Sequence, residues 1–343
     1  MRKIWKPFRH RLEYLGVLLV ASIVPLLPRR ACVVLAHLLG RAHWRLDRRG
    51  REVALANLAA AFGEKYSPAE RARIGRASFE NFARALLDLF WATRLNKASH
   101  ARWLRLEGFE RPAAVLGTHG ANIFAVNHFG AYEWAAIGGG FAGFTGWALA
   151  QEFKNPRLEK IFRRVRTVSG HDLIGRAQSM LKMLRALRRA RGGNANVGLL
   201  VDLTLRPSMP SAALTVFGGL KICATILHAV LHKRTGVPLT PLLGVPRADG
   251  TCVVTAHPAL AFPPGATHAE IAQGVWDFFE PFILARPELW LWNYKHFRYR
   301  PAEAPPGTEA GKRYPYYARE SGPFDRLIVA QAQGGSAPAA TLK

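Results

Sequence analysis

Cysteine and acidic residues are both scarce in this chain of 343 residues. The three cysteines, Cys32, Cys223 and Cys252, lie far apart and form no Cys-x-x-Cys pair. Their spacing excludes a disulfide framework and a zinc knuckle, and it favours a reducing compartment. Only 23 Asp and Glu stand against 48 Lys and Arg, so the formal net charge is +25. Such an excess predicts a polyanionic partner, which is nucleic acid, anionic lipid head groups or an acidic carrier protein.

The N-terminal region also lacks a hydrophobic run of the length that ordinarily spans a membrane. Residues 16–27 are almost uninterrupted in apolar character, but a standard span needs roughly 20 residues, and Pro25 interrupts the run. Residues 1–50 carry eleven Lys and Arg and only two acids. An apolar helix flanked by bases and aromatic residues is typical of a helix lying in a membrane interface. An ordinary buried helix is the alternative.

Residues 1–100 are therefore predicted to form a helical, membrane-associating region. Within it, Ser67-Pro68-Ala69-Glu70 is a capping box with proline at the first helical position. The apolar residues after this box recur at helical spacing, which predicts a long amphipathic helix to about Thr93. We expect its aromatic stripe to pack in the core.

Beyond Trp103, short apolar runs alternate with helical patterns, which predicts an α/β core with a mixed sheet flanked by helices. Arg247-Ala248-Asp249-Gly250 looks like a hairpin turn, so some strands are expected to be antiparallel. The expected strands are 122–126, 147–150, 196–201, 214–217, 239–245 and 251–256. The expected helices are 131–137, 156–168, 177–189, 225–233 and 268–284.

The core is expected to cover residues 101–301 and to be followed by a C-terminal extension over 302–343. Residues 302–311 and 334–343 are rich in small residues and proline, so this extension is expected to be partly disordered.

The sequence gives little support to three common kinds of functional site, namely a dinucleotide site, a zinc site and a serine-hydrolase site. Residues 138–143 match the spacing G-x-G-x-x-G, but they follow a helix rather than a strand, so a helix-terminating turn is expected there. His228 and His232 share a helix face, but the glutamate of a His-Glu-x-x-His zinc motif is missing. No G-x-S-x-G elbow occurs, which removes support for a serine hydrolase.

A better candidate site is the segment from Asn127 to Glu133. It follows the apolar strand 123–126 and leads into a helical pattern, so His128 is expected on a strand-to-helix loop. Residues five apart lie about 140° apart on a regular helix, so the two side chains meet only if Glu133 lies in the first turns after that loop. There Glu133 would fix the imidazole tautomer of His128 and stabilise its protonated form. Such a spacing also arises by chance, so its context decides.

That context is a series of landmarks in a fixed order. Residues 128–133, His-Phe-Gly-Ala-Tyr-Glu, resemble the H-x-x-x-x-[DE] motif of the lysophospholipid acyltransferase superfamily. More specifically, the chain resembles the bacterial lauroyl/myristoyl acyltransferases of lipid A biosynthesis over roughly residues 15–301. Further segments similar to this family are Asn57-Leu58, Phe62-Gly63-Glu64, Asn155-Pro156, Val201-Asp202, Val216-Phe217-Gly218, Arg234-Thr235-Gly236-Val237-Pro238 and Pro287-Glu288-Leu289-Trp290.

The resemblance implies transfer of a fatty acyl group from an acyl carrier protein or coenzyme A thioester to a hydroxyl of a lipid acceptor. His128 would act as general base, oriented by Glu133. The oxyanion would need donors from backbone N–H groups near Gly130 or from an arginine, Arg166 before Arg164. The residues expected to bind substrate are Asn127, Phe129, Gly130, Arg164, Arg166 and Asp202.

No metal and no cofactor beyond the donor's own are expected. No acyl-enzyme is expected either, because no Ser or Cys lies beside His128 in the sequence. The expected partners are anionic membrane lipids and an acyl carrier protein, and the expected location is the cytoplasmic face of the inner membrane, peripheral or N-terminally anchored. A non-enzymatic protein that binds nucleic acid or membrane is the competing class, and no nucleic-acid-binding signature supports it.

Three positions depart from the family pattern. Leu203 stands where the Gln of an Asp-Gln pair is usual, Asn127 where a small residue is common, and Tyr132 where Trp or Leu is frequent. These departures leave the acceptor open, and a glycerophospholipid is the alternative to a lipid A precursor.

Overall fold

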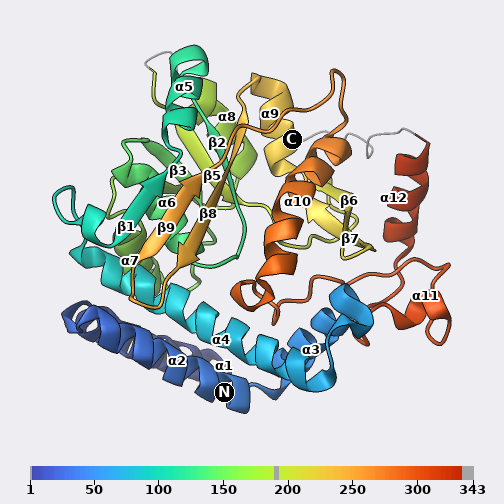
Figure 1. The fold of residues 1–343 in the computed structure, drawn as a ribbon, viewed down its shortest axis with the longest axis horizontal. Helices are drawn as coiled ribbons and strands as arrows, with labels where there is room; N and C mark the ends of the chain where they lie inside the picture. The colour runs from blue at the N-terminus through green and yellow to red at the C-terminus, as the bar shows by residue number, and fades with distance from the viewer. Residues whose placement is uncertain (1, 189–192, 334–343) are drawn as a thin grey trace.

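The computed structural model describes residues 2–188 and 193–333. Strands and helices alternate mainly between Leu104 and Ala256, and the described residues before and after this stretch contain helices but no strand (Figure 1). The helices are α1 Arg2–Ile23, α2 Arg29–Leu46, α3 Arg48–Phe62, α4 Pro68–Trp91, α5 Glu110–His119, α6 Tyr132–Phe141, α7 Pro156–Arg166, α8 Ser179–Arg188, α9 Leu227–Thr235, α10 His268–Ala285, α11 Glu309–Lys312 and α12 Gly322–Ala332. The strands are β1 Leu104–Glu107, β2 Ile123–Val126, β3 Gly146–Leu149, β4 Asp172–Ile174, β5 Asn196–Leu200, β6 Ala212–Phe217, β7 Leu220–Thr225, β8 Leu239–Pro246 and β9 Cys252–Ala256.

The main sheet has seven strands in the order β1-β9-β8-β2-β5-β3-β4. All neighbours in it are parallel except β8 and β9, which form an antiparallel hairpin, so the predicted mixed sheet flanked by helices is confirmed. The predicted turn lies at the tip of that hairpin, where the N–H of Gly250 donates to the Arg247 carbonyl at 3.1 Å. Strands β6 and β7 form a separate antiparallel pair.

Three strands and one helix of the core were not predicted from the sequence. Strands β1 and β4 are the two edges of the sheet, where one side is unpaired, and each has only three or four residues. Edge strands this short carry too few apolar residues for a clear periodic pattern. Strand β7 and helix α5 were also missed.

The glycine-rich run 138–143 contains the end of a helix, as the sequence predicts. Helix α6 ends at Phe141, four residues beyond its expected end at 137, and a turn follows in which the N–H of Gly143 donates to the Gly140 carbonyl at 3.0 Å.

The N-terminal helices form a layer beneath the sheet-bearing part of the molecule (Figure 1). Helix α4 is the long helix that the capping box predicts. The Ser67 hydroxyl accepts from the N–H of Glu70, and the Glu70 carboxylate accepts from the N–H of Ser67. This helix packs against α2 on one side and against α6 on another, so it supports the helix that follows His128.

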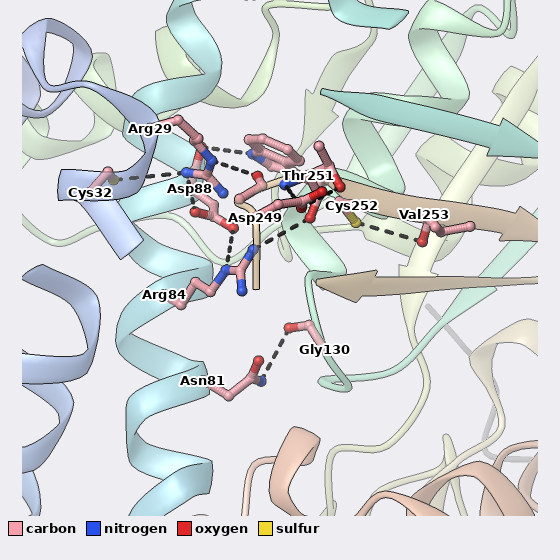
Figure 2. A network of polar contacts seen from close by, with 12 residues as sticks. Arg29, Cys32, Asn81, Arg84, Asp88, Gly130, Asp249, Thr251, Cys252 and Val253 are labelled. Atoms are coloured by element: carbon pink, nitrogen blue, oxygen red, sulfur yellow. Dashed lines mark hydrogen bonds and ion pairs between the residues drawn. The ribbon is translucent and has the colours of Figure 1, made fainter. Parts of the chain in front are cut away.

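A buried ion cluster fixes α2 to α4 (Figure 2). Arg29 lies 2.6 Å from Asp88, and these two side chains are 2% and 1% exposed. Arg84, one turn before Asp88, is 3.5 Å from the same carboxylate. The Arg29 guanidinium also lies over the ring of Trp134 in α6 and donates to the Gly250 carbonyl at 2.7 Å. The cluster therefore joins the N-terminal layer to α6 and to the β8–β9 hairpin.

Exposed apolar side chains follow one stripe of α1. They recur at intervals of three or four residues, which is helical spacing, and are Phe8, Leu12, Leu15, Leu19 and Ile23. None of the helices in the described part of the chain is both long and apolar enough to pass through a membrane.

The predicted C-terminal extension contains α11 and α12, and α12 contacts β6. Residues 334–343 lie outside the described residues.

Candidate active site

His128 lies on the loop between β2 and α6, as the sequence predicts. The loop turns at Gly130, whose φ of 59° is in the left-handed region, and a Cβ at this position would collide with the Gly244 carbonyl. Helix α4 supports the loop, because Asn81 donates to the carbonyl of Gly130 at 3.3 Å (Figure 2). Asn81 also donates to the carbonyl of Leu289 at 2.9 Å. Glycine at position 130 is therefore needed for the shape of the loop.

The backbone N–H groups of this loop are already occupied, so they are not free to bind an oxyanion. The His128 N–H donates to Asp202 Oδ2 at 2.9 Å, and the Phe129 N–H donates to the Asn127 carbonyl at 2.7 Å. The Gly130 N–H donates to the Leu289 carbonyl at 2.8 Å, and the Ala131 N–H donates to the Gly244 carbonyl at 2.8 Å. Of the two expected sources of oxyanion donors, this geometry leaves the arginine.

Asp202 is the carboxylate that contacts the His128 ring. Its Oδ1 lies 2.8 Å from His128 Nδ1, and its Oδ2 accepts both the His128 N–H at 2.9 Å and the Trp290 Nε1–H at 2.9 Å. The contact follows from the sheet. Strands β2 and β5 are parallel neighbours, and His128 and Asp202 each lie two residues beyond the carboxyl end of their strand.

Asp202 is ionised at neutral pH although it is only 2% exposed. Burial on its own would raise the pKa of this carboxyl, but the adjacent His128 ring and its hydrogen bonds outweigh burial and lower the pKa to about 2. An ionised carboxylate only accepts hydrogen bonds, so Nδ1 of His128 carries the proton. Nε2 is then the basic nitrogen of the ring.

Glu133 has a different partner. Arg166 in α7 donates to it through Nη2 at 2.7 Å and Nε at 3.2 Å, forming a bidentate pair with the first turn of α6. Burial would lower the pKa of Arg166, but the Glu133 carboxylate outweighs it and raises that pKa. The expectation that Glu133 orients His128 is therefore corrected. A fixed cation from α7 holds Glu133, and Asp202 holds the ring.

The other residues predicted to bind substrate differ in their burial and in whether they line the cavity. Asn127 is 1% exposed, and its side-chain amide has no hydrogen-bond partner among the described residues. Phe129 is buried in the main hydrophobic core, so its side chain packs rather than binds substrate. Arg164 is exposed on α7, and only Arg166 of the two arginines lines the cavity beside His128.

The cavity has a volume of about 880 Å³. Its walls are mainly apolar and come from α6, β2, β3 and β5. His128, Glu133 and Arg166 line it together, and the exposed residues Lys154 and Arg176 line it as well. The site thus consists of a base and an arginine beside a large, mainly apolar cavity.

Two further residues of the site were not singled out from the sequence. Trp290 anchors Asp202 through its indole N–H, and His296 stacks on the Trp290 ring at 4.0 Å. Burial lowers the pKa of His296 to about 4, so this second histidine is neutral at neutral pH. The Trp-rich segment was the available signal, but nothing local indicates that it contacts a residue 88 positions earlier.

The two helical histidines set aside above behave as packing residues. His228 is fully buried, and burial lowers its pKa to about 3, while His232 Nδ1 contacts the Val237 carbonyl at 2.9 Å. Among the described residues, no group of three His, Cys, Asp or Glu is arranged to hold a metal ion.

This arrangement suits proton abstraction next to a bound apolar chain. His128 can take a proton through Nε2, Asp202 can stabilise the resulting imidazolium, and the paired Arg166 supplies fixed positive charge. Because Nε and Nη2 of Arg166 contact Glu133, its Nη1 is the nitrogen without a hydrogen-bond partner in the described structure.

A family model described as bacterial lipid A biosynthesis acyltransferase matches residues 3–299. This span contains both sheets and all the site residues discussed above. A comparison with curated proteins gave no match. The family match covers most of the chain and agrees with the resemblance carried by the ordered sequence landmarks. The chain therefore belongs to the bacterial lipid A biosynthesis acyltransferase family.

Proposed function

We propose that this acyltransferase moves a fatty acyl group from an acyl carrier protein or coenzyme A thioester to a hydroxyl of a lipid A-type acceptor. One observation carries the proposal. The buried, ionised Asp202 holds Nδ1 of His128 at the wall of a large apolar cavity, which leaves Nε2 as the base. An apolar chamber suits a fatty chain, and a base at its wall suits activation of a hydroxyl.

In the proposed reaction, the acceptor hydroxyl loses its proton to His128 Nε2 while its oxygen attacks the thioester carbonyl. The tetrahedral intermediate then collapses, the carbon–sulfur bond breaks, and the imidazolium returns the proton to the departing thiolate. The products are the acyl ester and the free thiol. His128 and Asp202 end the cycle in their starting protonation states.

Arg166 is the proposed electrostatic stabiliser of the oxyanion. The backbone N–H groups of residues 128–131 are committed to other acceptors, whereas Arg166 lines the cavity with one guanidinium nitrogen uncommitted. Glu133 holds this arginine in place and so acts as a positioning residue.

The cysteines favour direct transfer without an acyl-enzyme. All three are buried, and burial raises the pKa of the Cys32 thiol to about 11 and that of Cys223 to about 12, while the pKa of Cys252 is raised further. Thiols with such pKa values are poor nucleophiles at neutral pH.

The charge and the apolar stripe on α1 support action at the cytoplasmic surface of the inner membrane, where anionic lipids and an acidic carrier protein would both be partners. The net charge of +25 favours both, and the stripe offers an apolar face for lipid.

The test is a lipid profile together with a purified assay. Cells that express the protein should gain an acylated lipid by mass spectrometry, and cells with His128→Ala should not. In vitro, His128→Ala should lower kcat by roughly 10²-fold to 10⁴-fold. His119→Ala is the matched control, because His119 is exposed at the end of α5 and outside the cavity. Undiminished acylation by His128→Ala would refute the assignment of the base.

A further inference from the structure

The three consecutive glycines inside α6 need an explanation, because glycine weakens a helix interior. Two of them are explained by packing. A Cβ at Gly138 would lie 3.2 Å from side-chain atoms of Leu106 and Val254, and a Cβ at Gly140 would collide with Ser169. Close approach of neighbouring segments therefore accounts for these two positions.

Gly139 is different. It is buried, yet a Cβ built there would meet no atom within 4 Å outside its own helix and immediate neighbours. A buried position with no neighbour faces an internal space, and Gly139 is a wall residue of the large cavity. The missing side chain leaves part of that cavity empty.

The position of Gly139 along the cavity follows from the helix. Tyr132, Ala136 and Gly139 all line the cavity at intervals of four and three residues, so they lie along one face of α6. Tyr132 packs edge-on against the His128 ring, with centroids 4.9 Å apart. Gly139 lies seven residues further on, about 10 Å along the helix axis at 1.5 Å per residue.

An aromatic pair lies beside Gly139 at this depth. The N–H of Phe144 donates to the Gly139 carbonyl at 3.1 Å. Phe144 meets Phe124 edge-on at 5.4 Å, and both rings line the cavity. Phe124 lies in β2 before Val126, further from His128 along the chain. The position of Gly139 in α6 and that of Phe124 in β2 therefore place both residues at the end of the cavity remote from His128.

We propose that Gly139 sets the length of the acyl chain that the enzyme transfers, a conclusion that rests on the proposed acyl transfer. The acyl chain runs from His128 along α6, past Ala136. The methyl end of the acyl chain occupies the space beside Gly139 in front of Phe124 and Phe144. A side chain at position 139 fills that space and shortens the chain that fits. The role of glycine at position 139 is to leave space for the acyl chain, and no special backbone conformation is required there.

The experiment measures kcat/KM of the purified full-length protein with a series of saturated acyl thioesters of increasing length. Gly139→Met should move the optimum to shorter chains, with a loss of at least about tenfold on the longest good substrate, since one misfitted methylene costs that much in an apolar pocket. Gly139→Ala should make a smaller shift in the same direction. It should also raise the melting temperature, because alanine favours the helix.

Gly117→Met is the matched control. Gly117 is also helical with nothing within 4 Å of its Cβ position, but it is exposed on α5 and outside the cavity. An unchanged chain-length optimum in Gly139→Met, or an equal loss at every length, would overturn the inference while acyl transfer by the wild type stands. If Gly139→Met does not fold, the optimum of Gly139→Ala decides by the same criterion. Wild-type protein inactive on every thioester would instead refute the proposed function.

Discussion

Two carboxylates near His128 have separate tasks, and their partners distinguish them. Asp202 Oδ2 accepts two N–H groups, from the His128 backbone and the Trp290 indole, while Oδ1 faces the ring nitrogen Nδ1. Glu133 is committed to Arg166. We therefore assign the orientation of the base to Asp202 and the placement of positive charge to Glu133.

Replacing Asp202 by asparagine tests this division. The amide oxygen of the new side chain would have to occupy the Oδ2 position, because two N–H donors point at it. The amide NH₂ would then face Nδ1 of His128 and force the proton onto Nε2, the wrong tautomer for the base. We expect Asp202→Asn to lower kcat by roughly 10³-fold to 10⁴-fold in the acyl transfer assay.

Glu133→Gln is the comparison for that prediction. It weakens the hold on Arg166 without altering the His128 tautomer, so its loss of kcat should be smaller than that of Asp202→Asn. Nitrogen NMR of the His128 ring should report a changed tautomer in Asp202→Asn only. Near-normal activity in Asp202→Asn, with a large loss in Glu133→Gln, would return the orienting role to Glu133.

At the scale of elements, the sequence predicted those features that local patterns encode. The capping box at Ser67 starts α4, and the apolar run before His128 becomes β2 with the histidine on the following loop. The Asp202 contact could not be predicted in this way. It spans 74 residues and depends on β5 lying beside β2, an order that no local pattern gives.

The buried arginine Arg29 shows the same limit. It is one of the eleven Lys and Arg in residues 1–50 that indicated a basic flank for an interfacial helix, but Asp88 and two tryptophan rings enclose it. Such burial becomes visible only when α2 and α4 are placed side by side.

The ion cluster between α2 and α4 leads to a stability prediction. Asp88→Asn would leave Arg29 and Arg84 buried without their counter-charge, and an unpaired buried charge typically costs about 3–5 kcal/mol. We expect a loss of that size in the free energy of unfolding, measured with urea. Arg29→Met and Arg84→Met combined with Asp88→Leu should recover much of it, because removing all three charges leaves none unpaired.

The control for Asp88→Asn is Glu52→Gln on α3. Glu52 pairs with Arg48 at 2.8 Å, but both side chains are exposed, so its loss should change the free energy of unfolding by less than about 1 kcal/mol. Equal effects of the two variants would show that the buried cluster contributes no more than a surface ion pair.

At the scale of the whole molecule, charge and apolar exposure combine on the N-terminal layer. The protein carries +25 overall, and residues 1–50 alone hold eleven Lys and Arg against two acids. The stripe on α1 leaves Leu15 57% and Leu19 60% exposed. Interfacial helices bind lipid through buried apolar area together with attraction to anionic head groups. The N-terminal layer is packed directly against the part of the protein that carries the site, because α4 contacts both α2 and α6.

This combination predicts binding to anionic vesicles through α1. Wild-type protein should co-sediment with phosphatidylglycerol vesicles, less so as salt is raised, because salt screens the attraction to head groups. Leu15→Asp with Leu19→Asp should weaken binding at least about tenfold, since burying one leucine is worth about 1.5–3 kcal/mol. Val329→Asp is the control, because Val329 is 54% exposed on α12, far along the chain from the stripe. Equal weakening by the two changes would show that lipid does not contact α1, and that the net charge alone brings the protein to the vesicle.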